Sequence, residues 1–326
     1  MPFVSREEHI EYLLFLKNLL KDQVYVELVY MTGVLPIAKY SSGSELNMFA
    51  EYDMATKEKF GSYFGFLDCE VDKLYAVYQK NTRNQRITRK DLCLWYDGYH
   101  IASGERLYNP RSVVLALSDN QLSDYWTSSG PYDEIFYYIR NNIDDVRDDL
   151  VLMAAGERVA AEIGQYTAAS LEIRTREQIY SAMVVYGLLT YEDGEVFIPN
   201  KELMNQFDEL LLTKDSLGYV YRLARKSEQM LKATLEGKVE VMEEILQYAH
   251  NTESPILSYN SETELSAVVN LCYLAARDKY HVAREDKAGK GFVDFIFYPE
   301  RRNLDCIILE LKIDSTPTQA IRQIKE

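Results

Sequence analysis

Three charged residues interrupt an apolar stretch near the C-terminus, GFVDFIFYPERRNLDCIILELKI at residues 291–313. They are Asp294, Glu310 and Lys312. The pattern predicts two strands joined by a polar turn at ERRN, with successive side chains on opposite faces. A register symmetric about Arg302 places Asp294 directly across from Glu310, with their Cβ atoms about 5 Å apart, and Lys312 on the same face.

Two carboxylates this close repel each other unless a cation lies between them. Carboxylate oxygens suit Mg²⁺ or Mn²⁺, and such an ion binds a scissile phosphate and lowers the pKa of a bound water. A neighbouring lysine stabilises negative charge that develops during the reaction. Glu-x-Lys alone also fits a surface ion pair, so the hypothesis of a metal-dependent site depends on Asp294 being in register.

The elements around this hairpin fit the same chemistry. In SETELSAVVNLCYLAARDKY, Ser261 is a candidate helix cap and Glu262 lies in the first turn, where an acid also suits the helix dipole. After the hairpin, TPTQAIRQIKE predicts the start of a helix that carries Gln319 and Gln323. Helix, hairpin and helix is the order of a PD-(D/E)xK nuclease core.

The composition limits the classes of function. The 326 residues suggest two or three domains, and 47% apolar content indicates a globular protein. The net charge of −15 argues against a large nonspecific nucleic-acid surface, although a local basic groove stays compatible with it. The four cysteines form no CxxC pair, and no signal peptide or apolar run of transmembrane length occurs. We expect a cytoplasmic protein without a membrane partner.

The rest of the chain gives coarser predictions. An amphipathic helix is expected from residue 5 to about 22, followed by a buried strand in VYVELVYMTGVLPI that ends at Thr32 and Gly33. The middle region is mostly helical. Within it, YEDGEVFIPN predicts a hairpin between two helices with Asp193-Gly194 at its turn. This resembles a winged helix, but few Lys or Arg residues occur there, which favours a packing role over DNA contact.

Several motifs occur in the order found in a bacterial family that pairs an AAA-ATPase-like region with a C-terminal PD-(D/E)xK nuclease-like domain. They are VYMTGVLPIAKY, YFGF, WYDGY, YNPRSV, YWT, GEVFIPN and the hairpin itself. The resemblance covers nearly the whole chain. It implies that five residues are nuclease-like catalytic positions, namely Glu262, Asp294, Glu310, Lys312 and Gln323, the first three of them as metal ligands.

The resemblance also gives expectations for the N-terminal part. Thr32 lies where an ATPase sensor residue would bind nucleotide, although it is equally well explained as the end of a strand. Tyr96, Asp97, Gly98 and Tyr99 form a landmark of the family that we interpret as a structural clasp.

The chain also departs from the family. No G-x-x-x-x-G-K-[ST] phosphate-binding loop occurs, so ATP hydrolysis by this chain is not expected. The sequence stops at QIKE, inside the predicted helix, where the nuclease core would continue. We therefore expect an incomplete sheet with an exposed edge, open to a protein partner or a second copy of the chain.

The predicted fold is mixed α/β and multidomain. An AAA-ATPase-like region is expected at 1–118, a helical, winged-helix-like region at 119–250, and a partial PD-(D/E)xK domain at 251–326. The predicted function is Mg²⁺- or Mn²⁺-dependent cleavage of DNA or RNA. The alternatives are a non-catalytic nucleotide-switch or interaction protein, and an inactive fragment of the ATPase-like protein.

Overall fold

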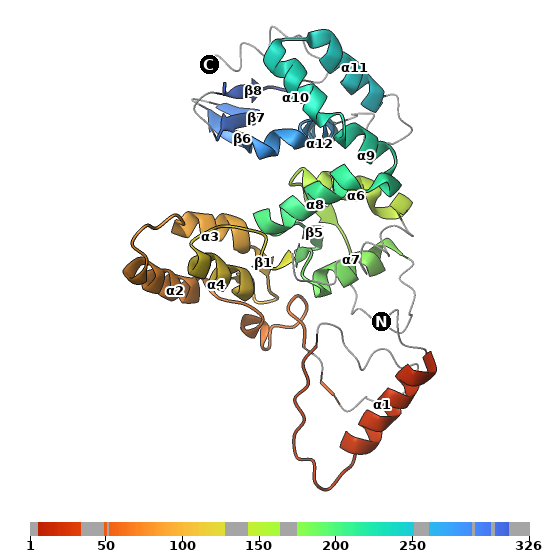
Figure 1. Ribbon diagram of the computed structural model, residues 1–326. Coiled ribbons are helices and arrows are strands. Elements are labelled where there is room, and N and C mark those ends of the chain that lie inside the picture. Colours follow the sequence, from red (N-terminus) through yellow and green to blue (C-terminus); the bar gives the residue numbers. More distant parts are fainter. Residues whose placement is uncertain are drawn as a thin grey trace. The chain divides into compact units, whose positions relative to one another are not determined.

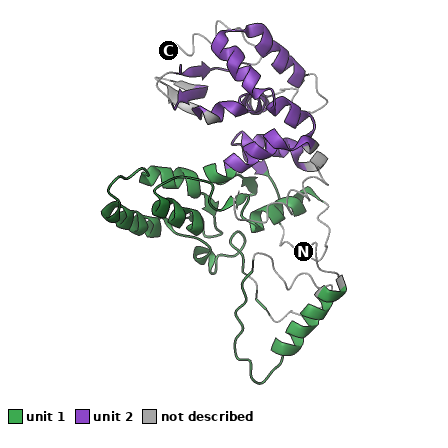
Figure 2. Cartoon of the chain, in the orientation of Figure 1, with its two compact units in different colours: residues 1–142, 160–203 green, residues 143–159, 204–326 purple. Residues whose placement is uncertain are grey.

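The structure is a computed structural model. It describes residues 6–33, 49–50, 52–127, 143–163, 175–250, 261–288, 291–300 and 304–312. The chain divides into two compact units, shown in Figure 2. Unit 1 comprises residues 1–142 and 160–203, and unit 2 comprises residues 143–159 and 204–326. The predicted mixed α/β class is confirmed, whereas the ATPase-like and nuclease-like assignments and the three domain boundaries stay predictions.

Unit 1 contains five described α-helices, a pair of short strands and the hairpin of β4 and β5 that is described below (Figure 1). The helices are α1 (Arg6–Leu20), α2 (Asp68–Asn81), α3 (Arg89–Tyr96), α4 (Pro110–Asp119) and α7 (Arg176–Val185). The strands are β1 (Tyr99–His100) and β2 (Arg106–Leu107), which run antiparallel. Apolar side chains from α2, α3 and α4 form one core around Val71, Leu92, Tyr96 and Val113.

Local sequence signals explain where these helices begin. The Thr88 side chain accepts a hydrogen bond from the amide of Asp91, and the Asp91 carboxylate accepts one from the amide of Thr88, which completes a capping box for α3. Asn109 caps α4 through the amide of Ser112, and Pro110 occupies the first turn, where its missing N–H is not needed. Each cap stabilises its helix by about 1 kcal/mol.

The segment after α1 is not the buried strand that its apolar residues predict. Residues 23–33 have no regular secondary structure, and the side chains of Val24, Leu28 and Tyr30 are exposed. A strand needs a partner for its main-chain groups, and no described residue pairs with this segment. The prediction is therefore wrong up to Gly33, and residues 34–37 lie outside the described ranges.

The predicted hairpin between two helices is confirmed. Strands β4 (Thr190–Glu192) and β5 (Glu195–Phe197) pair antiparallel between α7 and α8 (Lys201–Thr213). Asp193 and Gly194 form the turn with φ of 50° and 88°, as Asp-Gly in a two-residue hairpin loop requires. A further short strand, β3 (Val159–Ala160), gives the strand order β3-β5-β4.

Unit 2 places a sheet beside helices (Figure 1). Its helices are α6 (Ile143–Ala154), most of α8, α9 (Tyr219–Ala224), α10 (Ser227–Glu236), α11 (Val239–His250) and α12 (Glu262–Cys272). The strands are β6 (Tyr280–Ala288), β7 (Gly291–Pro299) and β8 (Ile307–Leu309), in the order β6-β7-β8 and antiparallel throughout. Val293, Phe295 and Phe297 are buried on one face of β7, as the alternation predicts.

Candidate functional site

The register of the predicted hairpin is confirmed. Phe295 pairs with Leu309, Ile296 with Ile308 and Phe297 with Ile307. Continued by one residue, this register puts Asp294 opposite Glu310, and the alternation of faces puts Lys312 on the same side as Glu310. The three charges that interrupt the apolar pattern therefore come together beside one end of β8.

Main-chain pairing between β7 and β8 ends at the Phe295–Leu309 pair. The next amide on that side, from Leu311, donates to the Asp294 carboxylate at 2.6 Å. Asp294 therefore replaces a main-chain carbonyl as the acceptor and helps to position the residues around Glu310. This contact gives Asp294 a structural role in addition to the predicted metal-binding one.

Glu310 is the most constrained of the three residues. Its side chain is 1% exposed, and Oε1 accepts a hydrogen bond from Lys312 Nζ at 2.6 Å. The other oxygen, Oε2, is buried and has no hydrogen-bond partner among the described residues. A buried ionised oxygen without a partner has a large desolvation cost, so this atom has an unused capacity for a cation.

The donor set agrees with the predicted ions only in part. Carboxylate oxygens from Asp294 and Glu310 are the ligand type that Mg²⁺ and Mn²⁺ prefer. Within the described ranges, however, no three His, Cys, Asp or Glu side chains gather as metal ligands would. The third predicted ligand, Glu262, begins α12 after the cap Ser261, whose side chain accepts a hydrogen bond from the amide of Glu264 at 3.1 Å. The side chain of Glu262 itself lies outside the described part.

The other predicted positions are not brought to this site. Thr32 lies in the exposed, irregular segment of unit 1, so no strand end supports a sensor role there. Gln323, with the helix predicted after the hairpin, lies outside the described residues. Among the described strands, β6 and β8 are at the two edges of their sheet.

Sequence reasoning missed a buried carboxylate that connects three of the landmark motifs. Glu202, in the first turn of α8, is fully buried in unit 1. Its oxygens accept hydrogen bonds from the Ser112 hydroxyl at 2.7 Å and from the amide of Trp126 at 2.6 Å. These partners belong to YNPRSV and YWT, and Glu202 follows GEVFIPN by two residues. Desolvation raises the pKa of Glu202, and the two hydrogen bonds partly oppose that rise.

The fourth landmark, WYDGY, contacts the same region. Gly98 has φ of +107°, and a Cβ placed there would lie 2.1 Å from the carbonyl oxygen of Pro199. Tyr96 Oη donates to the carbonyl of Ser123 at 2.9 Å and accepts from its amide at 3.1 Å. These contacts support the interpretation of WYDGY as a structural clasp.

Comparison with known proteins adds little on function. No family model matches the chain, and no solved structure matches it. The chain is 26% identical over 116 residues to an uncharacterized protein in the vnfD 5' region of Azotobacter chroococcum mcd 1. The matched part covers 35% of this chain and 21% of that protein, so the similarity concerns about a fifth of the relative's length.

No described helix is both long enough and apolar enough to cross a membrane.

Proposed function

We propose that the hairpin of β7 and β8 carries the catalytic end of a Mg²⁺- or Mn²⁺-dependent nuclease acting on DNA or RNA in the cytoplasm. The observation that carries this proposal is Glu310, whose buried Oε2 has no hydrogen-bond partner in the described part of the chain although Oε1 accepts from Lys312. A buried carboxylate oxygen without a donor is typical of a site that a ligand completes. Asp294 lies directly opposite Glu310 in the register of β7 and β8.

Each residue has a distinct role in this proposal. Asp294 and Glu310 hold the ion, and Glu262, at the start of α12, is the proposed third ligand. The bound ion supplies Lewis acidity for a phosphodiester and lowers the pKa of a water molecule. Lys312 orients the Glu310 carboxylate and places a positive charge where the phosphate develops negative charge. Gln323 is a proposed additional contact from the following helix.

The test uses variants that keep the observed hydrogen bonds. Asn at position 294 still accepts from the Leu311 amide, and Gln at position 310 still accepts from Lys312. Glu300→Gln is the matched control, since Glu300 is an exposed acid directly after β7. We expect Mn²⁺ binding, followed by isothermal titration, in wild type and Glu300→Gln but not in Asp294→Asn or Glu310→Gln.

Cleavage assays then test the chemistry. Mn²⁺-dependent cleavage of DNA and RNA should fall by about 100-fold or more in Glu310→Gln and Lys312→Ala, because losing one electrostatic contact to the transition state has that effect. Unchanged cleavage in both variants would disprove the proposal. If wild type does not bind Mn²⁺, the three charged residues have only a structural role.

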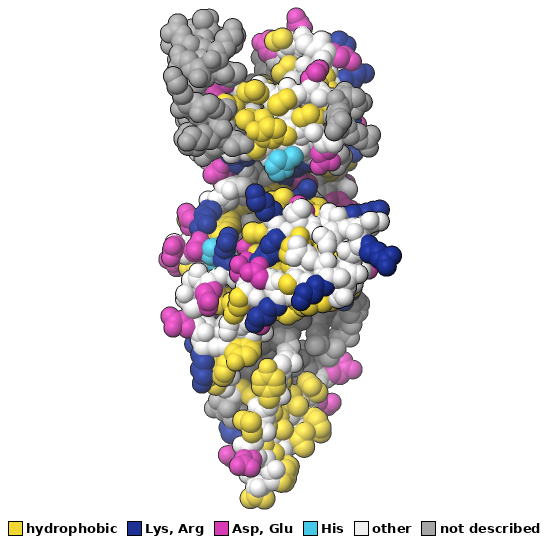
Figure 3. All heavy atoms as spheres, turned by 90° about the vertical axis from the view of Figure 1, so that its left-hand side faces the viewer, with side chains coloured by type: hydrophobic (Ala, Val, Ile, Leu, Met, Phe, Trp, Pro, Cys, Tyr) yellow, Lys and Arg dark blue, Asp and Glu magenta, His cyan; other side chains and the backbone are white. Residues whose placement is uncertain are grey.

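A second candidate is a non-catalytic interaction protein. The side chains of Val24, Tyr25, Leu28 and Tyr30 are exposed on the segment after α1. Figure 3 shows hydrophobic side chains at the surface of unit 1, in the lower part of the view. Contiguous exposed apolar surface is typical of protein contacts. If the partner is a second copy, sedimentation should show concentration-dependent association that Leu28→Asp abolishes, whereas a monomer at all concentrations would exclude self-association.

A further inference from the structure

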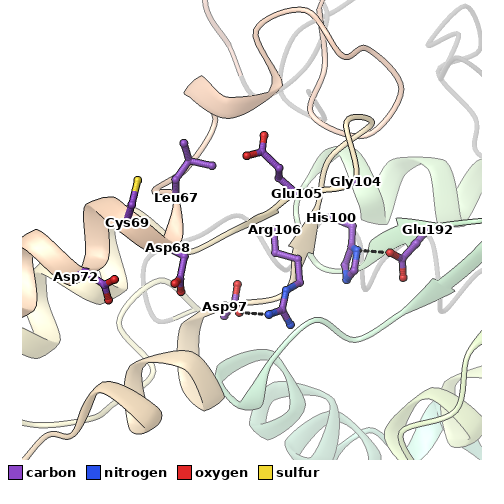
Figure 4. Close-up of a pocket in the computed structure, with 10 residues that line it drawn as sticks. All are labelled: Leu67, Asp68, Cys69, Asp72, Asp97, His100, Gly104, Glu105, Arg106 and Glu192. Carbon is purple, nitrogen blue, oxygen red and sulfur yellow. Dashed lines mark ion pairs between the residues drawn. The ribbon is translucent and has the colours of Figure 1, made fainter.

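Unit 1 contains an open pocket of about 720 Å³ that the nuclease proposal does not use. Figure 4 shows side chains from the first turn of α2, the end of α3, the β1–β2 hairpin and β4 around it. A divalent ion needs far less space than this. The volume lies in the range of about 300–1,000 Å³ that small organic ligands occupy.

Half of the ten residues that line the pocket are acidic, and most of these acids lie beside a basic side chain. Arg89 binds Asp68 at 2.6 Å and Asp72 at 2.7 Å. The Nδ1 atom of His100 lies 2.7 Å from Glu192. The most buried acid in the lining is Asp97.

Asp97 occupies an unfavourable place for a carboxylate. It is 4% exposed and follows the last residue of α3, where the negative end of the helix dipole opposes a carboxylate. One oxygen, Oδ2, lies 3.4 Å from Arg106 and accepts from the Cys93 thiol at 3.4 Å. The other, Oδ1, is buried and has no hydrogen-bond partner among the described residues.

Arg106 compensates this charge only weakly. Its side chain is 56% exposed, and a long, solvated ion pair contributes little. It is fixed opposite His100 by the β1–β2 register. Within the described ranges, the Asp97 carboxylate therefore lacks a strong positive partner and a donor for Oδ1, and one cationic N–H group would supply both.

We propose that this pocket binds an organic cation, with an ammonium or guanidinium group on Asp97 and its carbon chain in the open part. A metal ion fits less well because no three metal-ligating side chains gather in the described structure. The same chemistry is offered by a free amine and by a lysine or arginine side chain. The ligand competes with Arg106 for the Asp97 carboxylate.

The test is isothermal titration of the full chain with agmatine, putrescine and an acetyl-Gly-Arg-Gly-amide peptide, in about 150 mM salt to screen nonspecific attraction. We expect saturable binding of at least one probe, and the peptide distinguishes a side chain from a free amine. Asp97→Asn should weaken binding about tenfold or more, since a charge-assisted hydrogen bond is lost. Glu58→Gln, which removes an exposed acid outside the pocket, should leave the affinity unchanged.

Two further results decide the assignment. Arg106→Gln should tighten binding several-fold, because the competing cation is gone, and a weaker affinity would contradict the proposal. Circular dichroism and thermal melting without ligand confirm that each variant folds. The proposal is wrong if no probe binds below about 10 mM, if Asp97→Asn binds like wild type, or if Mg²⁺ or Mn²⁺ binds instead and is lost in Asp97→Asn. None of these outcomes bears on Asp294 or Glu310.

Discussion

Glu202 accepts a hydrogen bond from the hydroxyl of Ser112 at 2.7 Å, although 90 residues of chain separate them. The same carboxylate accepts the amide of Trp126 at 2.6 Å. One buried charge thus fixes the first turn of α8 to the first turn of α4 and to the segment after it. Residues in or next to three of the landmark motifs therefore meet at one carboxylate in unit 1.

Removing this carboxylate should destabilise unit 1. Glu202→Ala leaves the Ser112 hydroxyl and the Trp126 amide buried without a partner, and we expect a loss of about 2–5 kcal/mol in the free energy of unfolding. Glu202→Gln keeps an acceptor for Trp126 and a polar group beside Ser112, so its loss should be smaller. Urea unfolding of the three proteins measures the difference. Equal stability of wild type and Glu202→Ala would contradict the buried network.

The raised pKa of Glu202 makes a signed prediction for pH. The ordinary pKa is 4.5, and burial raises the folded value. The folded state therefore holds this proton more tightly than the unfolded state, and wild type loses stability relative to Glu202→Gln as pH rises from about 4.5 through the raised pKa. Above that pKa the difference should be constant. Unfolding free energies of both proteins between about pH 4 and 8 test this, and a wild type that gains stability relative to Glu202→Gln as pH rises would refute it.

Gly98 and Gly104 form a matched pair for testing the clasp. Both have positive φ, of +107° and +84°, so Ala costs about 1–2 kcal/mol of backbone strain at either position. Only at Gly98 would the new Cβ meet another atom, the carbonyl oxygen of Pro199 at 2.1 Å. We expect Gly98→Ala to be less stable than Gly104→Ala by about 1–3 kcal/mol in urea unfolding. Similar losses would show that Pro199 moves freely.

The elements that could be predicted from the sequence are those set by neighbouring residues. The alternation in 291–313 gives the register that pairs Phe295 with Leu309, because a slip of one residue would expose Phe295 and Phe297. The pair Asp193-Gly194 predicts the turn between β4 and β5, and Ser261 predicts the start of α12. Both depend only on residues a few positions away. In each of these cases the neighbouring residues alone were enough to predict the element.

The elements that could not be predicted depend on distant partners. Strand β6 has Arg284 opposite Phe295, and this charge hides the alternation. Arg284 is accommodated by Glu157 at 2.6 Å and Ser266 at 2.8 Å. Asp97 and Glu202 likewise resemble ordinary helix-end residues until the contacts around them are known. No local pattern marks a carboxylate that other segments will bury.

The ion pair of Glu310 and Lys312 gives a test that separates function from stability. If the pair serves the proposed site, it is not needed for folding, because replacing a buried ion pair by apolar residues is often neutral or stabilising. Lys312→Met alone leaves the Glu310 carboxylate, 1% exposed, without its cation. We expect that variant to lose about 3 kcal/mol, the low end of the usual range because Lys312 is 26% exposed.

The double variant Glu310→Leu with Lys312→Met should recover this loss and melt at or above the wild-type temperature, while Mn²⁺ binding is absent. Thermal melting and urea unfolding of the single and double variants measure the coupling between the two positions. A double variant that is several kcal/mol less stable than wild type would mean that the pair exists for stability. We do not expect that outcome, because Oε2 of Glu310 is buried without a hydrogen-bond donor among the residues that the structure describes, and a purely structural pair gains nothing from such an oxygen.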